Sequence, residues 1–427
     1  MTTRPRGIDE GRQSALKPYR VLDLTQELGA FCGRILADLG ADVIKIEPPG
    51  GDPTRRLGPY YHDRPHDERS LFWFIHHAGQ RGITLDLTTA SGQALLRRLL
   101  GPADVVLESF PPGHLESLGI GPETLLAERP DLIVTSITPF GQTGPYRDYQ
   151  AGDLELMALS GCMSVAGEPG RPPLRISHPQ AGYWAGTYAA AGTILALIHR
   201  GQTGEGQHVD VSAQACLVSA LGHAPAFWDL NREDQQRHGI FMTGRSVTGA
   251  KMRVIWPCVD GYLNFIIYGG EAGRRTNLAL VQWMMEKGMD VPQFLREKDW
   301  GRFDIATVTQ EEISQIEAAI APFFARLTKA EFCDGVIKRD MLGFPVTTPE
   351  DILADPQLEA RDFWEHVAHP ELDATVLYPG PFTRVAGGET GIRWRAPLLG
   401  EDNELIYGTE LGLTREELSA LHEGGVI

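Results

Sequence analysis

The chain has 427 residues, 42% of them apolar and 22% charged, which is the composition of a folded globular protein and not of a disordered or fibrous one. With 39 Lys and Arg against 56 Asp and Glu, the net charge of −17 disfavours binding to nucleic acid or to an acidic membrane surface. Five scattered cysteines without a CxxC pair fit a reducing cytosol and argue against a disulfide framework or a thiolate zinc site. The polar N-terminus and the absence of any uninterrupted apolar window of about 18 residues predict a cytoplasmic protein without a secretory signal or a membrane span.

Regular structure is expected to begin at Arg20. The segment Arg20–Leu24 alternates in the manner of a strand, Gly29–Leu39 carries apolar residues on one helical face, and Asp42–Ile46 reads as a second strand. A strand, a helix and a strand joined in this way predict a parallel sheet with right-handed crossovers.

Later segments extend this pattern. Strands are predicted at Ile83–Leu87, Asp104–Glu108, Asp131–Ile137 and His208–Val211, and helices at Thr89–Leu100, Asp153–Ser160 and Tyr183–Arg200, the last ending in a turn at Gly201–Gly206. The early strands carry runs of Val, Ile and Leu, which favour a sheet covered on both faces. The fold class is therefore α/β.

The chain divides into four parts by pattern. We expect a flexible arm at 1–20, a large domain at 21–224, a smaller domain at 225–345, where the β-α alternation ceases, and a segment at 346–427 that returns to the large domain. The final helix, Thr414–Gly424, begins with Thr414 and has Glu417 three positions later, which is a capping box.

Several common site motifs are absent. No GxGxxG follows the first strand, and neither GxxxxGK[ST] nor GxSxG occurs, which disfavours a dinucleotide site, a P-loop and a hydrolase elbow. Histidine pairs occur at His62/His66, His76/His77 and His366/His369, but no nearby acidic residues complete a metal-binding set. We therefore expect no metal site.

Six stretches, read in order, carry more information than any single motif. They are VLDLTQELGAFCGRILADLGADVIKIEPPGGDPTRR at 21–56, ITLDLTTASGQALL at 83–96, ADVVLESFPPGHLESLGIG at 103–121, PDLIVTSITPFGQTGPYRDYQAGDLELMALSG at 130–161, TGEGQHVDVS at 203–212 and RAPLLGEDNELIYGTELGLTREEL at 395–418. Together they resemble the family III CoA-transferases, the group of formyl-CoA:oxalate and carnitine CoA-transferases.

This resemblance implies a Rossmann-like large domain with a parallel sheet, a smaller α+β domain, and two chains interlocked as a dimer. It also implies a reaction in which a buried Asp attacks an acyl-CoA thioester and forms a mixed anhydride. Coenzyme A then passes from an acyl-CoA donor to a carboxylic acid, and glycine amides stabilise the developing oxyanion. Acyl-CoA is therefore the implied substrate, without a metal.

One position departs from the family pattern where the chemistry needs a side chain. The nucleophilic Asp of the family lies in a stretch like ADYAGG, and the corresponding stretch Pro179–Gly186 reads PQAGYWAG, which puts Gly182 at the Asp position. No Asp or Glu occurs from Arg171 to His199, so a small shift of the alignment does not supply one.

The expected CoA contacts are also altered. The family's NKRS reads Gly79–Gly82, with Gln80 in place of a Lys that approaches CoA, and the family's ENFRPG reads ESFPPG. The remaining cofactor-binding candidates are Arg81, Ser109 and Phe110, of which the Phe110 ring is expected to stack on adenine. Loss of cations from a diphosphate site weakens electrostatic binding.

Three hypotheses follow. In the first, the chain is the non-catalytic subunit of a heteromeric CoA-transferase whose homologous partner carries the Asp, as in the family's enzyme for (R)-benzylsuccinate in anaerobic toluene degradation. In the second, it is an active transferase, lyase or hydrolase that uses a displaced carboxylate, Asp153 or Glu155. In the third, it is a binding protein that holds ligands with arginines such as Arg55/Arg56 or Arg274/Arg275.

Two further implications concern the ligands and a related activity. The racemase branch of the superfamily has a GHD motif that reads Ala151-Gly152-Asp153 here, so the required His is missing and racemisation is disfavoured. The small-molecule partners are an acyl-CoA and a carboxylic acid, with an aromatic or dicarboxylic acid such as benzylsuccinate as one candidate.

Overall fold

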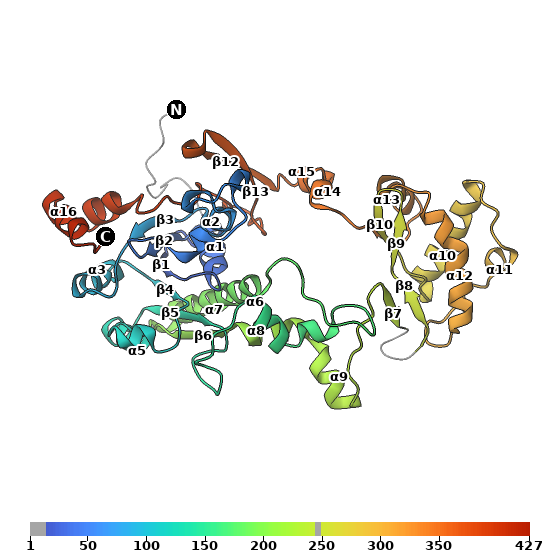
Figure 1. The fold of residues 1–427 in the computed structure, drawn as a ribbon, viewed down its shortest axis with the longest axis horizontal. Helices are drawn as coiled ribbons and strands as arrows, with labels where there is room; N and C mark the ends of the chain where they lie inside the picture. Colours follow the sequence, from blue (N-terminus) through green and yellow to red (C-terminus); the bar gives the residue numbers. More distant parts are fainter. Residues whose placement is uncertain (1–13, 244–248) are drawn as a thin grey trace. The chain divides into compact units, whose positions relative to one another are not determined.

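The computed structural model describes residues 14–243 and 249–427 (Figure 1). Contacts within the chain divide it into two units, each described by itself below. Unit 1 contains the residues up to 160 together with 176–220 and 357–427, and unit 2 contains 161–175 and 221–356. Of the predicted N-terminal arm, residues 1–13 lie outside the described residues. Leu16, within the same predicted arm, is buried and its N–H donates to the Leu39 carbonyl.

Unit 1 is built on a parallel sheet. Among the described residues it has six strands in the order β3-β2-β1-β4-β5-β6, and every neighbouring pair is parallel. The strands are β1 Arg20–Leu24, β2 Asp42–Glu47, β3 Arg81–Thr84, β4 Val105–Glu108, β5 Ile133–Thr138 and β6 His208–Ser212. This is the Rossmann order, in which the direction of strand addition reverses between β1 and β4 and leaves a crevice outside their carboxyl ends.

Helices cover both faces of this sheet, as the apolar strands predict. Their bounds are α1 Ala30–Asp38, α2 Leu71–His77, α3 Ala90–Leu100, α4 His114–Ser117, α5 Pro122–Glu128, α6 Asp153–Leu159, α7 Ala181–Thr203 and α8 Ala213–Leu221. On one face, leucines of α3 and α5 pack with Leu22, Ile44 and Val134 in a single core. On the other, α7 lies against β5, where the Thr135 and Thr193 hydroxyls are 2.8 Å apart.

Unit 1 is completed by the C-terminal part of the chain. This part contains α15 Pro356–Ala360, the hairpin of β12 Trp364–His369 and β13 Ala374–Pro379, a π-helical turn at Glu404–Glu410, and α16 Arg415–Glu423. Thr414 and Glu417 form the predicted capping box at the start of α16. Ile406 and Tyr407 pack into the core beside α3, which ties this part to the sheet.

Unit 2 is a mixed α+β structure with its own core. Its elements are α9 His223–Asn231, β7 Phe241–Thr243, β8 Lys251–Arg253, β9 Ile255–Cys258, β10 Gly261–Asn264, α10 Gly270–Glu286, α11 Gln293–Arg296, α12 Gln310–Phe324, α13 Lys329–Lys338, β11 Phe344–Pro345 and α14 Pro349–Leu353. Strands β9 and β10 are antiparallel, and the core around them contains Trp256, Trp283 and Trp300. These tryptophans are therefore packing residues of unit 2.

Two predicted boundaries are wrong. The third strand begins at Arg81 and ends at Thr84, because the Asp86 carboxylate accepts hydrogen bonds from Thr88 and turns the chain there. Helix α7 runs through Gly201 to Thr203 and ends where Gly204 adopts a left-handed conformation with φ of 79°. The turn therefore begins at Gly204, because that glycine and not Gly201 supplies the left-handed residue.

Close packing of α1 against α7 depends on Gly186. A Cβ atom at this position would lie 2.8 Å from the Cys32 nitrogen and 2.8 Å from the Phe31 Cβ, so the two backbones meet where the side chain is missing. Replacement of Gly186 by Val should destabilise the protein by about 1–3 kcal/mol through overpacking. Gly201→Ala is the matched control, since nothing lies near its added Cβ, and it should be neutral or stabilising. Urea denaturation measures both, and equal stabilities of the two variants would contradict the packing assignment.

Candidate functional site

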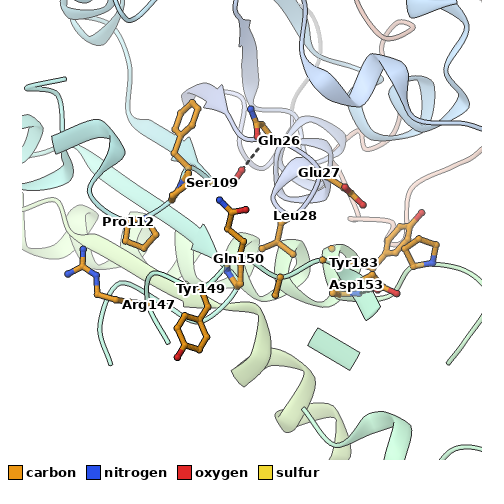
Figure 2. A pocket seen from close by; sticks show the side chains of 18 of the residues that line it. Gln26, Glu27, Leu28, Ser109, Pro112, Arg147, Tyr149, Gln150, Asp153 and Tyr183 are labelled. Carbon is orange, nitrogen blue, oxygen red and sulfur yellow. Dashed lines mark hydrogen bonds between the residues drawn. The ribbon is translucent and has the colours of Figure 1, made fainter. Parts of the chain in front are cut away.

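A cavity of about 370 Å³ lies at the carboxyl edge of the parallel sheet (Figure 2). Its walls come from the loops after β1, β4 and β5, from α2, and from the start of α7, all within unit 1. The residues that line it are Gln26, Glu27, Leu28, Phe72, His76, Ser109, Phe110, Pro111, Pro112, Pro139, Arg147, Asp148, Tyr149, Gln150, Ala151, Gly152, Asp153, Pro179, Ala181, Gly182 and Tyr183. Open α/β sheets bind ligands at this place, in the crevice where the strand order reverses.

Buried polar groups fix the loop between β1 and α1. The Asp23 carboxylate accepts hydrogen bonds from the Thr25 N–H at 2.8 Å and from its hydroxyl at 2.6 Å. Lys45 donates to the Thr25 carbonyl and forms an ion pair with Asp52 at 3.1 Å, all in the interior. These buried contacts hold the start of the loop in place beside the cavity.

Gly182 lies in the cavity wall on the first turn of α7. A Cβ atom at this position would be 3.3 Å from the Glu27 carbonyl oxygen and 3.8 Å from that of Leu28. Position 182 thus faces the loop after β1, and the missing side chain leaves space there.

Asp153 and Glu155, the two carboxylates predicted as alternatives, are both engaged by backbone. One oxygen of Asp153 accepts hydrogen bonds from the N–H groups of Gln180 at 2.6 Å and Ala181 at 2.8 Å, so this side chain caps α7. Glu155 accepts from the Gly152 N–H at 3.0 Å at the start of α6, is exposed, and does not line the cavity. Of the pair, only Asp153 belongs to the cavity wall.

Glu27 is a cavity residue that the sequence patterns did not single out. It is exposed on one side and lines the cavity on the other, and its carboxylate has no hydrogen bond or ion pair with any residue in the described parts of the chain. Partial burial, and then the negative charge of Asp153, raise the pKa of Glu27. Its place directly after a strand of the sheet is the signal that could have identified it.

Aromatic rings surround a buried histidine in the same wall. The His76 ring is stacked on the Phe72 ring at a centroid distance of 3.9 Å, and its centroid lies 5.4 Å from that of Tyr183. The Tyr183 ring packs edge-on against Phe31 at a centroid distance of 4.9 Å. His76 Nδ1 is 2.9 Å from the Phe72 carbonyl, so this nitrogen carries the proton and Nε2 is left as an acceptor. Burial lowers the pKa of His76 to about 4, which keeps the ring neutral at pH 7.

The predicted CoA contacts separate into two groups. Ser109 and Phe110 line the cavity, as Figure 2 shows for Ser109, whose hydroxyl accepts a hydrogen bond from the Gln26 N–H at 2.7 Å. The Phe110 ring is half-buried, and its centroid lies 4.8 Å from that of the His114 ring. The backbone N–H of Phe110 donates to the Glu108 carboxylate. Arg147, on the opposite side of the cavity from Glu27 in Figure 2, is the cation that sequence reasoning missed.

Arg81 does not join this group. It is the first residue of β3, at the amino edge of the sheet, and its buried guanidinium pairs with Asp42 at 2.6 and 2.9 Å and with Glu410. Gln80 is also fully buried, where its side-chain oxygen lies 3.0 Å from His77 Nδ1. The exchange of Lys for Gln at position 80 therefore alters the interior of unit 1 and removes no cation from the cavity.

Of the arginines in the binding-protein hypothesis, Arg55 is engaged in the interior. Arg55 is 1% exposed, pairs with Glu47 and Glu68, and stacks over the Trp73 ring at 3.8 Å.

In the parts of the chain that the structure describes, no group of three or more His, Cys, Asp or Glu side chains could hold a metal ion. No helix among the described residues is both long and apolar enough to cross a membrane.

Comparison with known proteins assigns the chain to a family. A family model for CoA-transferase family III matches residues 16–403. The chain belongs to CoA-transferase family III. The predicted Rossmann-like α/β class and the predicted family are both confirmed.

Individual relatives and solved structures match over nearly the whole chain. Subunit BbsE of succinyl-CoA:(R)-benzylsuccinate CoA-transferase from Thauera aromatica is 35% identical over 96% of this chain and 97% of its own. Succinyl-CoA–D-citramalate CoA-transferase from Chloroflexus aurantiacus is 33% identical over 96% of this chain and 98% of its own. The crystal structure of a CAIB/BAIF family protein from Brucella suis superposes with a TM-score of 0.78 at 28% identity, covering 93% of this chain and 99% of that one.

The cap supplied by Asp153 can be tested by its contribution to stability. Asp153→Ala leaves the Gln180 and Ala181 N–H groups without their acceptor and should lower the free energy of unfolding by about 1–2 kcal/mol. Asp153→Asn keeps an acceptor oxygen, so its free energy of unfolding should fall less than that of Asp153→Ala. Glu155→Ala removes one exposed hydrogen bond and should cost under about 0.5 kcal/mol. Urea titrations in which Glu155→Ala loses more stability than Asp153→Ala would refute the assignment.

The neutral state of His76 predicts a pH dependence of stability. Because its pKa is about 4 in the folded protein and about 6.5 in an unfolded chain, the unfolded state binds the proton first as the pH falls. Between pH 7 and pH 5 this group should remove about 2 kcal/mol from the free energy of unfolding. His76→Phe should lose correspondingly less stability over that interval, and His422→Gln, changed at an exposed residue, is the control. The same pH response in wild type and His76→Phe would contradict the assignment.

Proposed function

We propose that this chain is one subunit of a heteromeric family III CoA-transferase, and that a homologous chain bearing the aspartate supplies the nucleophile of the transfer. The observation that carries the proposal is Gly182: it lies in the wall of the cavity, where the family resemblance expects the Asp, and has no side chain to offer. A relative that matches nearly end to end is itself named as a subunit. The alternative that uses Asp153 or Glu155 is less favoured, because both are engaged by backbone N–H groups.

An exposed apolar stripe on α7 supports a partner chain. Trp184, Tyr188, Leu195 and Ile198 are 38%, 42%, 66% and 54% exposed, and they begin two residues after Gly182. Exposed apolar patches of this kind usually mark protein interfaces. We propose that the partner covers this stripe in the interlocked arrangement expected from the family, and that the complex acts in the cytoplasm.

The cavity suggests how an acyl-CoA and a carboxylic acid are accommodated. Phe72, Tyr183 and Leu28 offer an apolar wall to the acyl part of the substrate. Arg147 forms a solvent-exposed ion pair with Asp148 at 3.1 Å, and its remaining N–H groups can bind a carboxylate or a phosphate. Two relatives have succinyl-CoA in their names, and one of them also names (R)-benzylsuccinate. A dicarboxylic or aromatic acid as CoA acceptor, with succinyl-CoA as donor, fits this wall.

Reconstitution tests the proposed function. The chain is co-expressed with a homologue that has Asp at the position of Gly182, and transfer of CoA from succinyl-CoA to benzylsuccinate is followed by chromatography. The complex should transfer CoA, and replacement of the homologue's Asp by Ala should reduce the rate at least ~100-fold because the nucleophile is removed. Full activity of this chain alone, with no homologue present, would contradict the proposal.

Restoring an aspartate should not by itself convert this chain into a complete enzyme. In Gly182→Asp the new Cβ lies 3.3 Å from the Glu27 carbonyl oxygen, and the added carboxylate joins those of Glu27 and Asp153 in the same cavity. Like charges at short range disfavour the ionised form that the reaction needs. We expect less than about 1% of the rate of the complex, with Gly182→Ala as the steric control. A rate for Gly182→Asp alone equal to that of the complex would exclude this account.

A further inference from the structure

Three carboxylates line the cavity, and two of them are already engaged. Asp153 accepts hydrogen bonds from two N–H groups at the start of α7, and Asp148 forms an ion pair with Arg147 at 3.1 Å. Glu27 is the third, and its carboxylate has no hydrogen bond or ion pair among the residues that the structure describes. Glu27 is thus the cavity carboxylate that is available to react with a bound molecule.

The missing side chain at Gly182 gives a ligand access to this carboxylate. A Cβ at position 182 would already be in close contact with the Glu27 backbone, so a glycine leaves open the space between α7 and the loop after β1. Helix α7 has 23 residues, and the N–H groups of an α-helix's first turn have no partners within the helix. Those of Gln180 and Ala181 bind Asp153, whereas those of Gly182 and Tyr183 have no acceptor among the described residues and can stabilise an oxyanion in that space.

A separate observation identifies a group of the cavity wall that a ligand can contact. His76 is 6% exposed, and its Nε2 has no protein partner in the described residues although its Nδ1 is bonded to the Phe72 carbonyl. A ring nitrogen that faces a cavity can accept a hydrogen bond from water or from a ligand. Because His76 lines the cavity, a bound molecule with an N–H or O–H group would satisfy Nε2.

From this arrangement we propose that Glu27 is a nucleophile in this chain, attacking the carbonyl carbon of a CoA thioester bound beside Gly182. An Oε atom of Glu27 bonds to that carbon, the C–S bond breaks, and its electron pair leaves with the CoA sulfur as a thiolate. The product is a mixed anhydride between Glu27 and the acyl group. The thiolate then attacks the Glu27 carbonyl carbon, the acyl carboxylate departs, and Glu27 is left joined to CoA as a thioester.

This inference rests on the proposed function only in taking a CoA thioester as the ligand of the cavity. The proposed function assigns the main transfer to the aspartate of a partner chain, whereas Glu27 gives this chain a reactive carboxylate of its own. A heteromeric complex would then contain two unlike reactive sites. The raised pKa of Glu27 is consistent with a nucleophile, because a more basic carboxylate is a stronger one.

Chemical trapping tests the role of Glu27. The purified chain, alone and in the reconstituted complex, is incubated with succinyl-CoA and then treated with hydroxylamine, which converts an anhydride or thioester of Glu27 into a hydroxamate. Trypsin cleaves after Arg20 and Arg34, and mass spectrometry of peptide 21–34 locates the modified residue. We expect the hydroxamate at residue 27 in the wild type and in the control Glu205→Gln, and its complete loss in Glu27→Gln.

The outcomes separate this inference from the proposed function. Glu27→Gln should fold normally, because Glu27 is exposed and its carboxylate has no partner, and an unchanged melting temperature verifies this. If the complex transfers CoA while residue 27 remains unlabelled, or if the label stays in Glu27→Gln, the inference is overturned and the proposed function stands. If residue 27 is labelled although no homologue forms a complex, the inference stands and the heteromeric function falls.

Discussion

The hydrogen bonds from the start of α7 to Asp153 are the interaction on which the rest of the site depends. A helix of 23 residues begins at the cavity, and its first N–H groups need an acceptor. Asp153 supplies that acceptor from the first residue of α6, so the starts of the two helices are joined at one carboxylate beside the sheet edge. Gly182 follows one residue later, which means that this contact also fixes where the missing side chain lies.

Engagement of Asp153 decides what the other groups of the cavity can do. A carboxylate that holds two backbone N–H groups is a structural element, which leaves Glu27 as the free acid of the wall. On the other side, burial keeps His76 neutral, so it contributes an acceptor and no positive charge. Arg147 is therefore the cationic group of the cavity wall among the described residues, and an anionic part of a substrate is expected near it.

Much of the fold could be predicted from sequence, because the signals were local. Alternating residues and runs of Val, Ile and Leu predicted the strands of the parallel sheet, and Thr414 with Glu417 predicted the start of the last helix. The end of α7 was placed too early because Gly201 and Gly204 look alike in sequence, and only the backbone conformation distinguishes them. Ser109 and Phe110 were correctly expected at the sheet edge, since they directly follow a strand.

The remaining site residues could not be predicted, because their roles depend on contacts between distant segments. Arg81 looked like a CoA ligand, yet it is neutralised by Asp42 and by Glu410, which lies more than 300 residues away in sequence. Asp153 looked available until its partners on α7 were known. His76 belonged to a histidine pair with no visible purpose, and the aromatic rings that surround it come from α1, α2 and α7.

The central claim is that this chain works beside a homologue that carries the aspartate. The most direct measurement is native mass spectrometry of the tagged chain isolated from its source organism, with sequencing of whatever co-purifies. The account predicts a stoichiometric complex with a family III homologue that has Asp at the position of Gly182. A complex of this chain with itself alone, which transfers CoA without any homologue, would contradict it.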